Sequence, residues 1–183
     1  MDLRIAIVPV GRIDPVDVEA AAARIAKVLN TAVDSRPPTP VPKAGDDHAR
    51  GQHLSGPFLA ELRGSLARSG AAADATLFVT DVDLYKPGTD GVFGDIDAAS
   101  RVAVVSVRRL REAFYKRKAD PVKARARLVK LALYALGRAC GLPECREAGC
   151  ALFTTTALAD VDSKREQYCA ACWRRMTTGA HRI

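Results

Sequence analysis

Four cysteines near the C-terminal end of this 183-residue chain have the residue type and spacing of a metal site. Cys145 and Cys150 are separated by four residues, and Cys169 and Cys172 by two. Two short-spaced pairs are how a chain builds a closed tetrahedral thiolate site for zinc, because each short loop brings two thiolates to the same ion. The spacing therefore predicts one structural zinc ion, and such an ion typically contributes roughly 10 to 16 kcal/mol of apparent binding energy to folding.

Two disulfides are the alternative interpretation of these cysteines, since some intracellular proteins of very hot organisms are disulfide-rich. We favour zinc because the short loops suit it. The fifth cysteine, Cys140, has no histidine nearby in the sequence that could activate it as a nucleophile. We expect it to be a small buried hydrophobic residue.

An amphipathic helix is predicted directly before the first two cysteines. Asp120 and Pro121 have the types of a helix start, and Gly141 follows the predicted end at about Ala139. The apolar stripe at i, i+3 and i+4 spacing consists of Leu128, Leu131, Ala132, Ala135, Leu136 and Ala139. The opposite side would then be a basic face, made of Lys123, Arg127, Lys130, Tyr134 and Arg138.

The stretch from Leu131 to Trp173 resembles the archaemetzincins, in which a zinc-binding helix runs directly into a four-cysteine zinc site. The segment Ala75–Leu110, which contains VDLYKPG, is similar to that family's strand, loop and edge-strand region, and Ala49–Leu62 is similar to its R-G-Q-containing segment. The resemblance implies an α/β fold with a metzincin-like mixed, mostly parallel sheet packed with helices. It also implies an N-terminal subdomain over residues 1–140 and a small C-terminal zinc-binding subdomain over residues 141–183.

The resemblance also locates the positions of a catalytic zinc motif, H-E-x-x-H-x-x-G-x-x-H, in which three imidazoles hold the ion and a glutamate deprotonates its bound water. Here Tyr134 stands for the first ligand, Ala135 for the glutamate, Arg138 for the second ligand and Glu144 for the third. A guanidinium cannot be deprotonated in a protein and repels a divalent cation. We therefore expect a degenerate homologue without catalytic zinc, which is not an enzyme. Leu152 similarly replaces the methionine that lies under the zinc in the family.

Two arrangements of these positions are possible. Arg138 could pair with Glu144 across the glycine turn and lie beside Tyr134, since the family's geometry makes the three positions converge. Alternatively, the basic helix face is simply solvated and its members do not meet. The family's peptide cleft lies between the edge strand and this helix, so we expect an unknown peptide or protein as partner, with Arg138 favouring a carboxylate.

Two other functions remain open. The chain could be an active zinc metallopeptidase with an unconventional metal site. It could also be a zinc-stabilised nucleic-acid binder, although only 5% of its residues are aromatic and stacking on single strands favours clustered aromatic residues. The basic and aromatic candidates for that function are Lys164, Arg165, Trp173, Arg174 and Arg175. We do not expect nucleic acid as a partner.

A second group of possible metal ligands lies in the first third of the chain. Its members are Asp46, Asp47, His48 and His53, and the third histidine, His181, is remote in sequence. The surrounding segment is polar and contains glycine, so an exposed loop accounts for these residues without a metal.

Composition sets the remaining bounds. A hydrophobic content of 48% over 183 residues suits one globular domain with a small appendage, and the formal charge of +7 indicates a general tendency toward acidic partners. Because no apolar run reaches transmembrane length and LRIAIVPV is too short for a secretory segment, we expect a cytoplasmic protein without membrane contact. One asparagine, two glutamines and two methionines suit a thermophile, although GC-rich coding gives the same bias.

Hydrophobic patterning predicts the elements that position these residues. Strands are expected at 3–10, 31–35, 76–82, 92–96 and 102–107, and helices at 15–29, 57–69, 108–118 and 121–139. This order describes a mixed sheet packed against helices.

Overall fold

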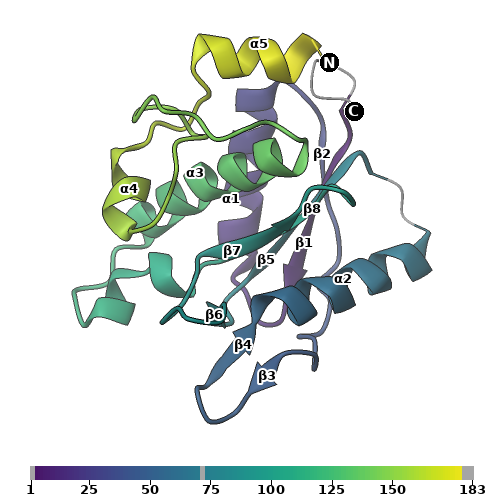
Figure 1. Ribbon diagram of the computed structural model, residues 1–183, viewed down its shortest axis with the longest axis vertical. Coiled ribbons are helices and arrows are strands. Elements are labelled where there is room, and N and C mark those ends of the chain that lie inside the picture. Colours follow the sequence, from purple (N-terminus) through teal and green to yellow (C-terminus); the bar gives the residue numbers. More distant parts are fainter. Residues whose placement is uncertain (1–2, 71–72, 179–183) are drawn as a thin grey trace.

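The computed structural model describes residues 3–70 and 73–178. A five-stranded sheet with the order β2-β1-β5-β8-β7 forms its centre (Figure 1). The strands are β1 (Ile5–Val10), β2 (Val33–Ser35), β5 (Ala75–Thr80), β8 (Val102–Ser106) and β7 (Gly94–Asp97). The first four are parallel, and only the edge strand β7 runs antiparallel to its neighbour. The predicted α/β class with a mixed, mostly parallel sheet is confirmed.

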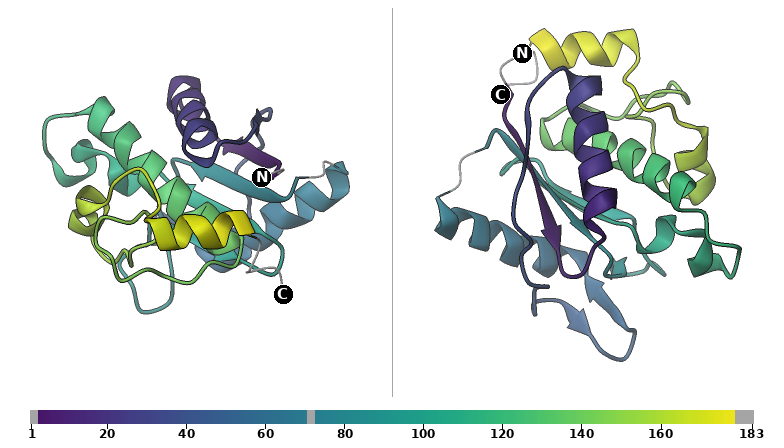
Figure 2. Two further views of the ribbon diagram at one scale, coloured as in Figure 1. Left: turned by 90° about the horizontal axis from the view of Figure 1, so that it is seen from above. Right: turned by 180° about the vertical axis from the view of Figure 1, so that it is seen from behind.

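Helices cover both faces of this sheet (Figure 2). Side chains alternate along each strand, so residues such as Leu77 and Val105 pack against α1 (Pro15–Leu29) and α3 (Pro121–Ala139). Their neighbours, such as Phe78 and Val104, pack on the other face against α2 (Ser55–Ser69). Burial on both faces explains why the central strands read as continuous apolar runs.

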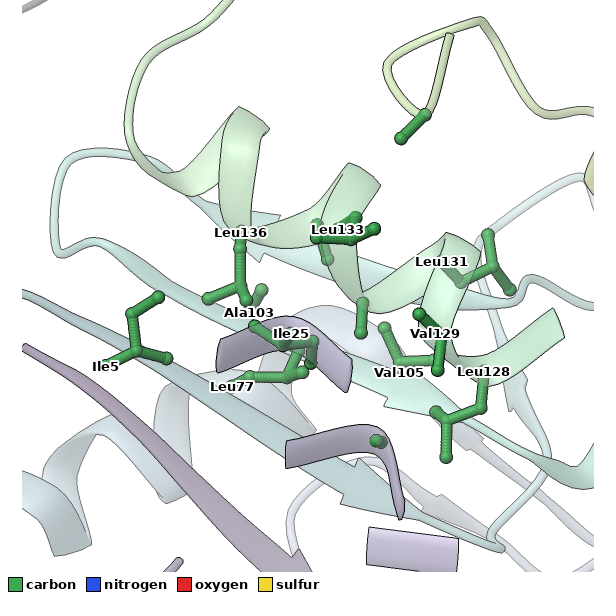
Figure 3. Close-up of a cluster of buried hydrophobic side chains, with 14 of the residues drawn as sticks. Ile5, Ile25, Leu77, Ala103, Val105, Leu128, Val129, Leu131, Leu133 and Leu136 are labelled. Atoms are coloured by element: carbon green, nitrogen blue, oxygen red, sulfur yellow. The ribbon is translucent and has the colours of Figure 1, made fainter. Parts of the chain in front are cut away.

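The helix α3 begins and ends where its sequence indicates. The Asp120 carboxylate accepts a hydrogen bond from the Lys123 backbone N–H, and Gly141, just past the helix end, has a φ of 88° that favours glycine. The side chains of Leu128, Leu131 and Leu136 point from α3 into the core over the sheet (Figure 3). This packing fixes which residues of α3 face away from the sheet.

A second, smaller sheet has the order β3-β4-β6 and consists of Asp46–Asp47, Gln52–Leu54 and Leu84–Tyr85. It was not predicted, because strands of two or three residues carry no readable alternation. The segment 108–118, predicted as one helix, instead forms two 3₁₀ helices, Arg108–Leu110 (η1) and Glu112–Tyr115 (η2). The chain is extended at Arg111 between them, with a ψ of 131°.

The C-terminal segment packs against α3 (Figure 1). It contains α4 (Leu158–Ser163) and α5 (Ala170–Thr178), and its buried residues Leu152, Val161 and Tyr168 belong to the same core as α3. Gly137 allows the close approach, since a Cβ there would lie 2.8 Å from Leu152 Cδ2. The boundary between residues 140 and 141 stays a prediction.

This packing argues against the alternative in which the whole basic face of α3 is simply solvated. Only 1% of the Arg127 side chain is exposed, and both Nε and Nη2 donate to the Asp162 carboxylate at 2.7 Å. Arg127 Nη2 also lies 2.8 Å from Glu112 Oε1. The helical pattern cannot reveal such a partner because Asp162 lies 35 residues further along the chain. Within residues 3–70 and 73–178, no helix is long and apolar enough to cross a membrane.

Candidate functional site

The four predicted cysteines come together. The Sγ atoms of Cys145, Cys150, Cys169 and Cys172 all lie within 4.8 Å of one another, and they form the one such group of His, Cys, Asp or Glu ligands in the described part of the chain. Cys145 and Cys150 lie on the loop after α3, Cys169 directly precedes α5, and Cys172 lies in the first turn of α5. Backbone contacts hold the loop, with Cys145 N–H donating to Leu152 O at 2.9 Å.

The surroundings of the cysteines fit a zinc ion. Three backbone N–H groups point at sulfur: Glu147 N is 3.4 Å from Cys145 Sγ, and Leu152 N and Cys169 N are 3.5 and 3.3 Å from Cys150 Sγ. Such donors favour the thiolate form that binds metal. All five cysteines are free, and the Sγ atoms of Cys145 and Cys169 are 3.9 Å apart, far beyond a disulfide length of about 2.05 Å. The cluster is therefore able to hold a metal.

A cleft of about 550 Å³ lies between the edge strand β7 and the helix α3. Residues 91–96 form one wall, and Leu131, Tyr134, Ala135 and Arg138 of α3 form the other. Thr155 to Leu158, at the start of α4, close one side. The former motif positions Tyr134, Ala135 and Arg138 thus line the cleft.

Tyr134 and Glu144 meet beside the cleft, as the family geometry predicts, but their contacts differ from those expected. The Tyr134 phenol donates to Glu144 Oε1 at 2.5 Å, and Thr154 Oγ1 donates to Glu144 Oε2 at 2.7 Å. Arg138 instead donates from Nη1 to Leu142 O at 2.6 Å. No ion pair within 4.0 Å joins Arg138 to Glu144 in these described residues, so the predicted pair is wrong. Two hydroxyl donors already occupy the carboxylate, and the turn carbonyl accepts from the guanidinium.

Burial raises the pKa of Tyr134 to about 12. The hydrogen bond to Glu144 acts in the same direction and Arg138 opposes it. The Tyr134 and Thr154 hydroxyls lower the pKa of Glu144, so the pair is a neutral phenol beside a carboxylate at neutral pH.

Lys164 also belongs to this group, and no local sequence pattern indicated that it would lie there. Its side chain is buried, and its Nζ lies 4.4 Å from the centre of the Tyr134 ring. It also donates to Thr155 Oγ1 and to Ala151 O. Burial lowers its pKa to about 8. The sequence-based alternative assigned Lys164 to a nucleic-acid surface, and its burial removes it from such a surface.

The other candidates are dispersed or occupied. Arg165 pairs with Glu147 at 3.3 Å, and Trp173 packs partly buried against the core, so no aromatic platform forms with Lys164. Cys140 is buried as predicted, and burial raises its pKa to about 11.

In the first third of the chain, Asp46 lies 3.4 Å from His48 Nε2 and 3.8 Å from His53 Nε2. Asp47 accepts instead from the Tyr85 hydroxyl at 2.9 Å. These residues do not form a group of three or more converging ligand atoms in the described ranges. His181 lies outside the described residues.

Comparison with known proteins gives a consistent result. The sequence model of peptidase family M54 matches residues 57–178. The archaemetzincin of Thermococcus kodakarensis is 38% identical over 127 residues, which cover 69% of this chain and 67% of the relative. Two solved structures also match this fold. One is a zinc-dependent peptidase from Methanocorpusculum labreanum, with 27% identity and a TM-score of 0.87 over 94% of this chain and 99% of that one. Another is the archaemetzincin of Archaeoglobus fulgidus complexed with malonate, with 29% identity and a TM-score of 0.78 over 94% of this chain and 99% of that one.

These findings overturn one prediction. Tyr134, Ala135, Arg138 and Glu144 at the motif positions led to the expectation that the chain is not an enzyme, whereas the matching family is a peptidase family and the matching structures include a zinc-dependent peptidase. The prediction relied on four positions of one site. Those positions show which ligand types are present there, but membership of the family is shown by the whole fold and by the cysteine framework. The predicted resemblance itself is confirmed: the chain belongs to peptidase family M54, the family of the archaemetzincins.

Proposed function

We propose that this chain binds an extended peptide segment in the cleft between β7 and α3, and that its four cysteines hold one structural zinc ion. The ion would tie the loop of Cys145 and Cys150 to the first turn of α5. That connection would hold the C-terminal segment against α3, and with it the wall formed by Thr155 to Leu158. Zinc at such a closed thiolate site supplies folding energy rather than chemistry.

The open edge of β7 is the observation that carries the peptide proposal. Hydrogen-bonded and non-hydrogen-bonded pairs alternate along an antiparallel ladder. Ser106 N–H donates to Phe93 O at 2.8 Å, so Phe93 and Ser106 form a hydrogen-bonded pair. Gly94 and Ile96, which pair with Val105 and Ala103, are therefore in non-hydrogen-bonded pairs. Their backbone polar groups point away from β8 toward the open edge, where an added strand would find them.

The side chains around this edge support the same use. Gly94 has no side chain, and a Cβ there would lie 2.1 Å from Val104 O, so the strand sits close to its neighbour. Asp95 is held from two sides, because its carboxylate accepts from Ser55 Oγ at 2.7 Å and from Lys86 Nζ at 2.6 Å. The edge is thus pre-formed, which lowers the entropy cost of adding a strand.

Backbone methylation of the ligand tests strand addition. Two otherwise identical peptides, N-methylated at odd or at even positions, are compared with the unmodified peptide by isothermal titration calorimetry. Because only every second residue of an added strand bonds to β7, one methylated peptide should lose most of its affinity and the other should keep it. Equal affinity of all three peptides would contradict pairing with β7.

Peptide hydrolysis is the second candidate function, and membership of a peptidase family favours it. A substrate in the cleft would pass the Tyr134 phenol and the Arg138 guanidinium, both of which line it. Cleavage of a library of fluorogenic peptides by zinc-loaded protein tests this function directly. Activity that a Tyr134→Phe or Arg138→Gln variant loses would assign it to this cleft.

We propose a cytoplasmic location, because none of the five cysteines forms a disulfide and a reducing compartment keeps cysteines in that state. Its partner in the cleft is a peptide or protein segment, and the buried Lys164 and the Arg165 pair with Glu147 count against nucleic acid. We also propose that it works at high temperature, and the ion network of Arg127, Asp162 and Glu112 supports this.

A further inference from the structure

Among the described residues, three cationic side chains line the cleft, and two of them form ion pairs with carboxylates. Lys86 lies 2.6 Å from Asp95, and Arg109 lies 2.6 Å from Asp83. Arg138 has no carboxylate oxygen within 4.0 Å among the described residues, and its side chain contacts the neutral carbonyl of Leu142 and the neutral phenol of Tyr134. A half-buried guanidinium with five N–H donors therefore faces the cleft without a carboxylate in direct contact among the described residues, and Glu144 acts on it only from a greater distance.

The carboxylate that could neutralise Arg138 is already engaged. Both oxygens of Glu144 accept hydrogen bonds from hydroxyl groups, Oε1 from Tyr134 and Oε2 from Thr154. The buried Lys164, whose Nζ lies 4.4 Å from the centre of the Tyr134 ring, adds a second cation. Lys164 interacts electrostatically with both Asp160 and Glu144, while Arg138 has no carboxylate in direct contact among the described residues.

We propose that the Arg138 end of the cleft binds a carboxylate of the bound peptide, either its C-terminal carboxylate or an acidic side chain. A carboxylate of the peptide would supply the direct charge partner that Arg138 lacks, and the planar guanidinium can bind it with two parallel hydrogen bonds. The Leu142 carbonyl holds Arg138 in place, so little side-chain freedom is lost on binding. This inference rests on the proposed function, since it assumes that a peptide occupies the cleft.

Binding of matched peptides separates the possible sources of the carboxylate. One peptide sequence is prepared with a free C-terminus, with a C-terminal amide, and as an amide with one internal glutamate, and affinities are measured by calorimetry for the wild type and for Arg138→Gln. Arg174→Gln is the control, because it removes the same charge from an exposed position on α5 outside the cleft. Malonate is the fourth probe, since it carries carboxylates but no peptide backbone.

We expect at least one acidic peptide to bind more tightly than the plain amide, and Arg138→Gln to remove that preference with a roughly tenfold loss of affinity, as for a hydrogen bond to a charged group. Arg174→Gln should keep it. The preferred acidic peptide identifies the carboxylate as terminal or internal. Equal binding of all three peptides would overturn the carboxylate site while leaving peptide binding intact. If no peptide binds, the proposed function fails. In that case, malonate binding that requires Arg138 would still support the carboxylate site. Absence of malonate binding as well would overturn the carboxylate site.

Discussion

Replacing Gly137 with alanine should destabilise this protein, although the same change in an exposed helix would stabilise it. The added Cβ would lie 2.8 Å from Leu152 Cδ2 and 2.9 Å from the Tyr168 hydroxyl. Neither atom can move freely: Leu152 is fully buried, and the Tyr168 hydroxyl donates to Leu133 O at 2.6 Å. The C-terminal segment would have to move away from α3.

The size of the effect follows from two opposing contributions. Overpacking of a well-packed core typically costs about 1 to 3 kcal/mol, and two contacts below 3.0 Å place this site in the upper half of that range. Replacing glycine with alanine in a helix interior increases the free energy of unfolding by about 0.5 to 1 kcal/mol. The net loss is therefore about 1 to 2.5 kcal/mol, which for a chain of this length corresponds to a fall in Tm of roughly 2 to 10 °C.

Denaturant unfolding followed by circular dichroism measures this change, and α2 supplies a control. Gly64 is also in a helix interior, but its Cβ would meet only the flexible end of Arg68 at 3.3 Å. Gly64→Ala should stabilise the protein by about 0.5 to 1 kcal/mol. If Gly137→Ala stabilises the protein as Gly64→Ala does, the close packing of the C-terminal segment on α3 is refuted.

Two further substitutions probe buried charges. Asp162→Asn should cost on the order of 2 kcal/mol, because it leaves the buried Arg127 with fewer charged partners, and the partial exposure of Asp162 keeps the loss below that of a fully buried pair. Arg127 lowers the pKa of Asp162 in the folded state, so the difference in the free energy of unfolding between wild type and variant should be complete above the unfolded pKa of about 3.8. It should shrink as the pH falls below that value. A difference that persists at pH 2 in chemical denaturation would contradict the pairing. Lys164→Met tests the buried amine, whose pKa falls from 10.5 to about 8 on folding. Because the unfolded chain binds more protons between these two values, the stability of the wild type should rise relative to that of the variant from pH 8 to pH 10.5. A constant difference in stability would argue against burial of Lys164.

Local sequence signals predicted the parts of the fold that depend on nearby residues. The central strands are apolar runs because both faces of the sheet are covered, and the helices α1 and α3 begin at Asp14 and Asp120, whose carboxylates accept backbone N–H groups. The cysteine cluster was predictable for a similar reason, since two short loops leave few ways to arrange four sulfur atoms.

Contacts between distant segments were not predictable from such signals. Arg127 and Lys130 looked like members of a solvated helix face, but α4 covers them, and Lys130 Nζ donates to Asp162 O at 3.0 Å. The partner of Glu144 was missed because Tyr134 and Arg138 occupy the same side of α3, and only the three-dimensional turn decides which one reaches the carboxylate. A charge pattern reports which side of a helix is polar and leaves open what packs on it.

The most direct test of the account is the zinc content per chain of protein purified without added metal, measured by elemental analysis. We predict one zinc ion per chain, lost in Cys169→Ser and kept in Cys140→Ser, because Cys140 lies outside the cluster of four sulfur atoms. Two zinc ions per chain would contradict the description of Glu144 as a carboxylate whose partners are the hydroxyls of Tyr134 and Thr154. Absence of zinc from the wild type, or its retention in Cys169→Ser, would contradict the structural zinc site.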